Sequence, residues 1–292
     1  MKTPLVSVCV VTYNQEAVLR NCLESIVAQE ADFEFEVIVF DDASTDATPE
    51  IIKEFTLKYS FVRAVLRNKN VGAFQNFIEC HSSSTAKLVC HCDGDDYWLP
   101  GKLKKQVDYM SKHPECNILW HKVKLLDSQG NLRDDNLRKE ILSKHFDKYD
   151  LAALGTVGVH SSKMYRKRGQ FNDIEGVPCI DYALNIIDVH DGYAKILDSE
   201  ALGVYRLGIG VSSSGLKTKV LYTKCYKALV KRDKRLKKYF VANALVKVIA
   251  ALKNFRIREA LIFIPTIIDV SVLSAIFYVI RNRNVIKMAS LR

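Results

Sequence analysis

The run LVSVCVVTYN, residues 5–14, contains the first strong structural signal in the chain. Residues 5–11 form a short apolar stretch rich in β-branched side chains, which is typical of a strand buried on both faces. Strands of this kind occur in parallel sheets that helices cover on both sides. Thr12, Tyr13 and Asn14 follow at once, so we expect this strand to end at a polar edge.

Further strand-like segments alternate with segments of helical spacing as far as residue 112. This alternation predicts an α/β fold with a mainly parallel sheet flanked by helices. Ser44, Thr45 or Asp46 is expected to cap a helix that has Pro49 in its first turn. The predicted elements are a helix over 16–28, a strand over 36–40, the capped helix to about Tyr59, a strand over 62–66, a loop over 68–72 with a short helix after it, a strand over 87–92, and a helix from Pro100 to about Lys112.

Polar clusters follow three of the predicted strands. They are residues 12–14, Asp41-Asp42, and residues 93–96 with the sequence DGDD. In open α/β sheets ligands bind beyond the carboxyl ends of the strands. Three such clusters on one edge indicate a site better than they indicate three unrelated turns.

The cluster Asp93-Gly94-Asp95-Asp96 is the sharpest chemical signal. Aspartates two residues apart at a strand end can place their oxygens around one hard divalent cation, Mg²⁺ or Mn²⁺. A cation held there would bridge to a diphosphate and neutralise charge that develops on a leaving group. The structural alternative is an Asp-Gly turn followed by helix-capping aspartates.

The other two clusters suit a nucleoside. Tyr13 offers an aromatic face to a base, and Asp41 and Asp42 can accept hydrogen bonds from a base N–H or from ribose hydroxyls. Helix capping is the structural alternative for both clusters.

The middle of the chain is less regular. Residues 116–126 indicate a strand that ends in an Asp-Ser-Gln-Gly-Asn turn, and residues 131–150 are expected to be a polar surface excursion. A helix is predicted over 181–190 and a strand over 194–197.

The net charge of +10 is unevenly distributed. Residues 1–215 carry a net charge of −5, whereas residues 216–292 carry +15. Residues 260–280 contain one charge, Asp269, and one proline, Pro265, both unfavourable in a membrane span. Basic helices beside an apolar stretch favour an interfacial element on an anionic membrane, with a helical dimer interface as the alternative.

Several other classes are disfavoured. Nucleic-acid binding lacks a known module, and a dinucleotide-dependent oxidoreductase lacks the G-x-G-x-x-G run after the first strand. The eight cysteines contain no C-x-x-C pair, which favours reduced thiols in a cytoplasmic protein. The run Cys90-His91-Cys92 has the wrong spacing for zinc, since strand alternation separates His91 from both cysteines. The start of the chain leaves no room for a signal peptide before the first strand.

Four stretches, taken together, resemble the family-2 glycosyltransferases, which are inverting enzymes that use nucleotide-sugars. They are VSVCVVTYNQEAVLRNCLESI, EVIVFDDASTDAT, NKNVGAFQNF and VCHCDGDDYWLPGKL, in the family's order. The resemblance is strong over residues 4–110 and resumes at CIDYALNIIDVHDGYAKILDSEALGVYRLGIGVSSSG. It implies a GT-A fold over residues 1–215, with a nucleotide-sugar half to about 112 and an acceptor half over 113–215. Residues 216–292 would be a helical, membrane-associated appendage.

The same resemblance implies roles for individual residues. Asp93 would contact the ribose or a metal, Asp95 would be the main ligand of Mn²⁺ or Mg²⁺, and Gly72 and Asn76 would lie beside the donor. The nucleoside pocket would be lined by Thr12, Tyr13, Asn14, Glu16 and Asp42.

An inverting transfer needs one carboxylate to take the proton of the acceptor hydroxyl. Asp181 stands where the family's paired acidic motif places that base, although Ile180 replaces the first acid. Asp173, Glu175 and Asp188 are the alternatives for the base. Asp181 could instead be only the N-cap of the following helix.

The resemblance also suggests partners and location. The Gln-x-x-Arg-Trp motif of processive relatives is absent, so one sugar is expected per encounter. We expect a nucleotide-sugar donor, UDP by resemblance, and a lipid-diphosphate-linked or oligosaccharide acceptor in bacterial O-antigen or capsule synthesis. The enzyme would be peripheral at the cytoplasmic face of the plasma membrane. A catalytically inactive GT-A binding protein is the alternative.

Overall fold

A computed structural model of the chain describes residues 3–168, 181–208, 215–267, 272–283 and residue 286. Contacts divide the chain into two compact units, and each is described here by itself. The first unit contains Met1–Asn136, Gly158–Phe171 and Ala194–Ser212. The second contains Leu137–Val157, Asn172–Tyr193 and Ser213–Arg292. These boundaries differ from the division at residue 215 expected from sequence, because two internal segments group with the C-terminal helices.

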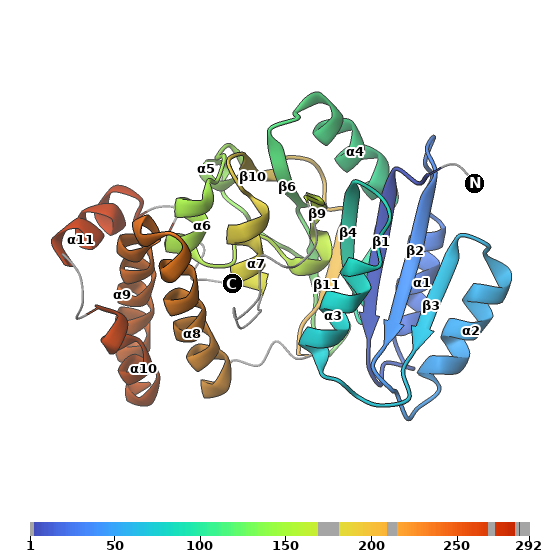
Figure 1. The fold of residues 1–292 in the computed structure, drawn as a ribbon, viewed down its shortest axis with the longest axis horizontal. Helices are drawn as coiled ribbons and strands as arrows, with labels where there is room; N and C mark the ends of the chain where they lie inside the picture. Colours follow the sequence, from blue (N-terminus) through green and yellow to red (C-terminus); the bar gives the residue numbers. More distant parts are fainter. Residues whose placement is uncertain (1–2, 169–180, 209–214, 268–271, 284–285, 287–292) are drawn as a thin grey trace. The chain divides into compact units, whose positions relative to one another are not determined.

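The first unit is built on a seven-stranded sheet (Figure 1). Its central strands β1, β2, β3 and β4 are mutually parallel where they pair, whereas β9 pairs antiparallel with both β4 and β6. The mainly parallel sheet predicted from sequence is therefore confirmed. In spatial order the strands are β10 (Tyr193–Leu197), β6 (Cys116–His121), β9 (Met164–Arg166), β4 (Leu88–Asp93), β1 (Val6–Thr12), β2 (Phe35–Asp41) and β3 (Val62–Leu66).

Burial explains why the central strands read as apolar runs. Val8, Val10 and Ile38 have no exposed surface, since helices cover both faces of the sheet. In Figure 1, α3 lies in front of the strands and α1 behind them. The covering helices are α1 (Leu19–Val27), α2 (Thr48–Lys58), α3 (Ala73–Ser82) and α4 (Lys102–Lys112).

A second, four-stranded sheet belongs to the same unit. Its order is β5 (Tyr97–Trp98), β11 (Gly203–Arg206), β7 (Lys124–Leu126) and β8 (Leu132–Asp134). The predicted Asp-Ser-Gln-Gly-Asn turn joins β7 to β8, where the Gly130 amide donates to the Asp127 carbonyl at 3.1 Å. This sheet brings β11, from late in the chain, beside the strand that follows the acidic cluster.

The polar surface excursion predicted over 131–150 is confirmed for residues 131–140, which are exposed or half-buried, but residues 141–150 also contribute to the core. The segment forms β8, the short helix α5 (Lys139–Leu142) and the start of α6 (Lys148–Leu154). Ile141, Leu142 and Phe146 are buried there. These three apolar residues anchor a segment whose average composition is polar, and no periodicity revealed them.

The second unit is helical in its described parts. A short core of Ala153, Val241, Ala242 and Ala275 joins α6 to the C-terminal helices, and the Asn243 side chain donates to the Ala153 carbonyl at 2.9 Å. Small residues at these positions let the helix backbones approach closely. The remaining helices are α7 (Asp181–Asp188), α8 (Leu216–Arg232), α9 (Lys237–Lys253), α10 (Ile257–Ile267) and α11 (Val272–Arg281).

Within the described parts of the chain, no helix combines the length and apolar character that crossing a bilayer requires. Pro265 lies inside α10, and Asp269 falls outside the described residues. Seven of the cysteines are described, and all seven are buried free thiols.

Candidate functional site

The three polar clusters share one edge of the sheet. Thr12 is the register partner of Asp41, and Val11 is the partner of Asp93, so β1, β2 and β4 end side by side. The shared edge predicted from sequence is therefore confirmed. Its geometry follows from parallel pairing, which aligns the carboxyl ends of neighbouring strands.

Asp93 is the most accessible carboxylate of the acidic cluster, with 38% of its side chain exposed. His91 Nε2 lies 3.1 Å from Asp93 Oδ1, Ser161 Oγ lies 3.3 Å from Oδ2, and the Asp93 amide donates to Ser161 Oγ at 3.0 Å. Partial burial acts to raise the pKa of Asp93, but His91, His160 and Ser161 outweigh it and hold that pKa at about 2. Asp93 is thus a carboxylate anion at neutral pH.

Asp95 and Asp96 are both buried, but they are held differently. Asp96 accepts hydrogen bonds from the Ser161 hydroxyl at 2.5 Å and from the Arg206 amide at 2.9 Å, so it ties β11 to the acidic loop. Burial, with the nearby Asp93 charge, raises the pKa of Asp95 to about 6. Asp95 therefore carries a poorly compensated negative charge, which a cation would stabilise.

Gly94 allows the acidic loop to pack tightly against the end of β1. Its amide donates to the Val11 carbonyl at 3.0 Å. A Cβ at this position would overlap the Gln15 side-chain oxygen and come within 3.0 Å of the Thr12 side chain. The glycine between the aspartates is thus required by a close approach of two loops.

The donor set fits a small hard cation. No group of three His, Cys, Asp or Glu side chains suited to a metal occurs among the described residues. Mg²⁺-type sites often use only one or two carboxylates and take their other ligands from water and substrate phosphates. Asp93, which is accessible, and Asp95, which lacks compensation, supply such a pair.

Most of the residues predicted for the nucleoside pocket form the framework of the edge. Thr12 Oγ1 donates to Gln15 Oε1 at 2.7 Å, and Asn14 Oδ1 accepts from the Thr45 amide at 2.8 Å. Glu16 Oε2 accepts from the Ala47 amide at 2.7 Å. Side chains after β1 therefore hold the loop after β2 in place.

Asp42 performs a similar role for the loop over 68–72. Its two carboxylate oxygens accept from the amides of Val71, at 2.8 Å, and Gly72, at 2.9 Å. Gly72 has φ of +90°, a conformation that side chains other than glycine rarely adopt, and it begins α3. The predicted donor loop is thus attached directly to the predicted base-binding aspartate.

Asn76 and Arg67 lie on either side of this loop in the sequence and bond to each other. Asn76 is buried, donates to the Phe40 carbonyl at 3.0 Å, and accepts from Arg67 Nε at 2.9 Å. Arg67 also pairs with Glu79 at 2.5 Å. Sequence reasoning missed Arg67, because a single arginine after a strand carries no distinctive pattern.

Tyr13 differs from its neighbours because 47% of it is exposed. Next to it in the sequence, the Asn14 amide donates to Ser44 Oγ at 2.8 Å. An exposed aromatic side chain on an ordered polar edge is available for stacking on a planar ring.

Asp181 belongs to the second unit. It is exposed at the first residue of α7, and its charge contributes to a raised pKa of Tyr222, whose main cause is burial. Of the alternatives, Asp188 ends the same helix, whereas Asp173 and Glu175 fall outside the described residues. The role of Asp181 as the base stays a prediction.

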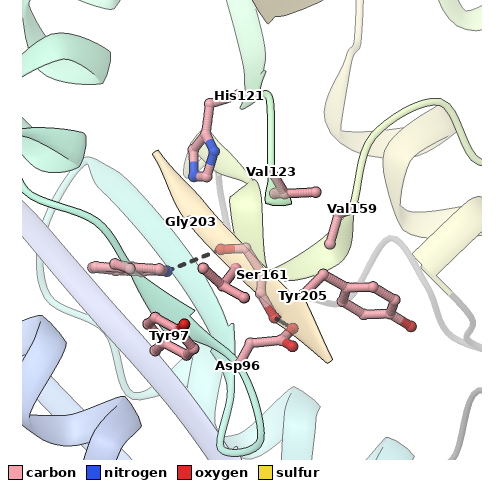
Figure 2. A pocket seen from close by; sticks show the side chains of 10 residues that line it. Asp96, Tyr97, His121, Val123, Val159, Ser161, Gly203 and Tyr205 are labelled. Carbon is pink, nitrogen blue, oxygen red and sulfur yellow. Dashed lines mark hydrogen bonds between the residues drawn. The ribbon is translucent and has the colours of Figure 1, made fainter. Parts of the chain in front are cut away.

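A narrow recess lies beside the acidic loop, within the first unit (Figure 2). Asp96 and Tyr97 face His121 and Val123 across it. The Trp98 indole donates to the Ser161 carbonyl at 3.0 Å, which fixes one wall. The full lining is Asp96, Tyr97, Trp98, His121, Val123, Val159, Ser161, Gly203, Val204 and Tyr205.

Sequence reasoning missed Ser161 and Arg206, which both contact the acidic cluster. Ser161 lies on the 3-10 helix η1 (His160–Ser162), and Arg206 ends β11. Their partners are more than 60 residues away along the chain, so local pattern could not identify them.

Comparison with known proteins identifies the family. Residues 7–174 match the model of glycosyl transferase family 2. The chain belongs to this family. An uncharacterized protein of Mycobacterium tuberculosis is 35% identical to this chain over 203 residues, covering 68% of this chain and 58% of that protein. The putative teichuronic acid biosynthesis glycosyltransferase TuaG of Bacillus subtilis is 30% identical over 131 residues, 45% of this chain and 51% of TuaG.

Solved structures agree on the fold. S. aureus TarS 1-349 in complex with UDP-GlcNAc matches with a TM-score of 0.62 at 19% identity, covering 82% of this chain and 71% of that one. The mannosyltransferase PcManGT of Pyrobaculum calidifontis, in complex with GDP-Man and Mn²⁺, matches with a TM-score of 0.55 at 16% identity, covering 99% and 85%. The chain has the GT-A-type α/β fold expected from its sequence. It spans about 58% of the length of the mycobacterial relatives that it matches.

Proposed function

We propose that this family-2 chain is a non-processive inverting glycosyltransferase. It would move a hexose or N-acetylhexosamine from a nucleotide-sugar, UDP-linked, to a sugar acceptor on a lipid diphosphate. The observation that carries the proposal is the acidic pair Asp93 and Asp95 at the edge where three parallel strands end. The names of TuaG, a teichuronic acid biosynthesis protein, and of the UDP-GlcNAc complex support the direction of the proposal.

The residues of the edge would have different roles in binding the donor. Tyr13 would stack on the base, while the loop held by Asp42 would close beside the nucleoside. Asp93 and Asp95 would hold Mn²⁺ or Mg²⁺, which supplies charge neutralisation at the diphosphate when bound. Asp93, with its pKa of about 2, stays ionised for this task at every physiological pH.

Asp181 is proposed as the general base. In a single displacement it would accept the proton of the acceptor hydroxyl while that oxygen attacks the anomeric carbon. Attack from the face opposite the diphosphate inverts the configuration. An exposed carboxylate at a helix start suits this task, because its oxygens stay reachable by a bound acceptor.

We further propose that the protein is peripheral at the cytoplasmic face of the plasma membrane, where a lipid-linked acceptor would lie. The turn between α9 and α10 supports this. Phe255 is 92% exposed there, with Leu252 and Ile257 exposed beside it. Lys253, Arg256 and Arg258 flank these apolar side chains. Apolar side chains ringed by cations match an anionic lipid surface.

A catalytically inactive binding protein at the membrane is the second candidate. It would keep the fold and the basic helices but would not need an acidic pair where three strands end. The presence of Asp93 and Asp95 at that edge, with Asp93 partly exposed, therefore favours the enzyme.

A donor panel tests the proposal. The purified chain is incubated with UDP-, GDP- and dTDP-sugars, a synthetic lipid-diphosphate sugar and Mn²⁺, and products are read by mass and by anomeric NMR. One donor nucleotide giving an inverted linkage supports the enzyme. Binding of UDP with Mn²⁺ but no product from any donor supports the inactive binding protein.

Vesicle flotation tests the location. Binding to phosphatidylcholine vesicles that contain phosphatidylglycerol, but not to phosphatidylcholine alone, is expected. Equal flotation with both, or none, contradicts the anionic-surface proposal. Sedimentation equilibrium of the same sample identifies the alternative, a homodimer formed through the C-terminal helices.

A further inference from the structure

A chain of hydrogen bonds runs from the sheet core to Asp93, all within the first unit. Tyr165 Oη lies 2.8 Å from His81 Nδ1, and His81 Nε2 lies 2.9 Å from His91 Nδ1. His91 Nε2 then lies 3.1 Å from Asp93 Oδ1. Both imidazoles have no exposed surface.

The fold brings these residues together from three elements. His91 and Asp93 project from the same face of β4 because they are two residues apart. Tyr165 stands on the neighbouring strand β9, as the register partner of Val89, and His81 comes from α3. Phe77 stacks on His81 with ring centroids 3.9 Å apart, and the His160 ring lies 4.0 Å from that of His91. Rings packed in this way have little freedom to rotate.

The direction of the bonds follows from the carboxylate. A carboxylate oxygen bonded to an imidazole nitrogen is the acceptor, so the 3.1 Å contact places a proton on His91 Nε2. With one proton on each ring, His91 Nδ1 accepts from His81 Nε2–H, and His81 Nδ1 accepts from the Tyr165 hydroxyl.

We propose that Tyr165, His81 and His91 form a hydrogen-bonded relay that positions the Asp93 carboxylate for a cation and diphosphate. Each donor fixes the tautomer of the next ring, and the last one fixes Asp93 Oδ1. The inference rests on the proposed function, because it assigns these side chains to the metal and donor site. The three are positioning residues and would not contact substrate themselves.

The relay differs from a merely structural network because it ends on a carboxylate that is 38% exposed. Outer groups that orient a metal ligand typically change metal affinity by 10- to 100-fold when removed. His91→Phe keeps an aromatic ring of similar size but removes the donor to Asp93. His91→Gln keeps a donor that can reach the same oxygen. Tyr165→Phe removes only the first hydroxyl.

The test measures the Kd of Mn²⁺ in the presence of UDP, by electron paramagnetic resonance, on the full chain. We expect His91→Phe to raise this Kd about 10-fold, His91→Gln to restore most of the affinity, and Tyr165→Phe to raise it by a smaller factor. Tyr226→Phe is the matched control, because it removes another buried tyrosine hydroxyl, bonded to Asn243 at 2.5 Å, in the second unit. The control should leave the Kd unchanged.

The outcomes separate the two proposals. If the wild type binds no Mn²⁺ with UDP, the proposed function fails. If it binds and His91→Phe binds equally well, the relay is refuted. Should His91→Phe not fold, Tyr165→Phe and a second measurement decide: long-range ¹H–¹⁵N NMR on histidine-labelled wild type. It should find single protons on Nε2 of His81 and His91, and a proton on Nδ1 of either ring overturns the relay.

Discussion

Asp95, which is buried, and Lys247, which is half-buried, are charges of opposite sign, one in each compact unit, and their surroundings differ. Asp95 lies beside the like charge of Asp93, at an edge where three strands end. The Lys247 ammonium lies 4.5 Å from the centre of the Tyr222 ring and 5.7 Å from that of Phe263. Burial raises the pKa of Asp95 to about 6 and lowers that of Lys247 to about 8.

The two charges stand in different environments and have different explanations. The negative charge is kept where a diphosphate and cation could reach it, so its cost to stability has a functional explanation. The positive charge is embedded between aromatic rings of a helical unit, where cation–π attraction offsets only part of the desolvation. Substitutions in both units test this difference.

The largest effect is expected for Asp95→Asn. Transfer should fall roughly 1,000-fold, because a cation ligand is worth several kcal/mol in the transition state. The fold should become more stable at pH 7, by about 3 kcal/mol at most, since the ionised form is disfavoured by a shift from 3.8 to about 6. This gain should vanish as pH falls from 6 to 4. Thermal melting and initial rates measure both effects.

Asp32→Asn is the matched control for that variant, because Asp32 is exposed and forms only a surface pair with Lys104 at 3.4 Å. It should change neither quantity. If the Asp95→Asn protein kept full activity, the functional explanation of this buried negative charge would be wrong.

Asp181→Asn should lower kcat about 100-fold or more, the typical contribution of a general base, while the Kd of the donor stays within about twofold. Asp188→Asn, at the other end of α7, is the comparison variant. Single-turnover rates and calorimetric titration with UDP measure the two parameters. Normal turnover in Asp181→Asn, with loss in Asp188→Asn, would move the base to the end of the helix.

Lys247→Met should stabilise the second unit, by about 1–2 kcal/mol at pH 7, because a depressed lysine pKa means that folding disfavours the charged form. The penalty is complete below pH 8 and disappears as pH rises from 8 toward 10.5. The difference in melting temperature between variant and wild type should therefore shrink over that range. Sugar transfer should not change, and a loss of transfer would mean that this charge also serves the reaction.

The smallest effect is expected for Phe255→Asn. Phe255 has φ of +57°, a conformation that asparagine tolerates better than phenylalanine, so the fold should not suffer. Binding to vesicles with anionic lipid should weaken roughly 10-fold, as expected when about half of an aromatic side chain's burial is lost. Leu57→Asn, at an equally bare position of α2 (88% exposed), is the control and should bind as the wild type does.

The local sequence pattern was sufficient to predict the strands in the N-terminal half of the sheet. The predicted strand over 62–66 agrees with β3 at both ends, and those over 36–40 and 87–92 agree with β2 and β4 to within one residue. Each is short, apolar and bounded by polar residues, and parallel pairing then aligns their ends without further information. Local pattern was incomplete over 141–150, where buried residues such as Phe146 are isolated among polar ones.

The run Cys90-His91-Cys92 shows a different limit. Strand alternation correctly separated His91 from the two cysteines, but it could not say what His91 would meet. His81 reaches it from a helix, 10 residues before it, and Tyr165 reaches His81 from an antiparallel strand, 74 residues after His91.

Neighbouring residues and composition were enough to predict the α/β alternation, the acidic cluster at a strand end and the separation of a basic C-terminal region. The partners that hold the acidic cluster depend on tertiary structure, because Ser161 and Arg206 reach Asp96 only when segments distant in sequence come together. The pKa values of Asp95 and Asp96 are both raised, since they depend on burial and on neighbouring charges rather than on residue type.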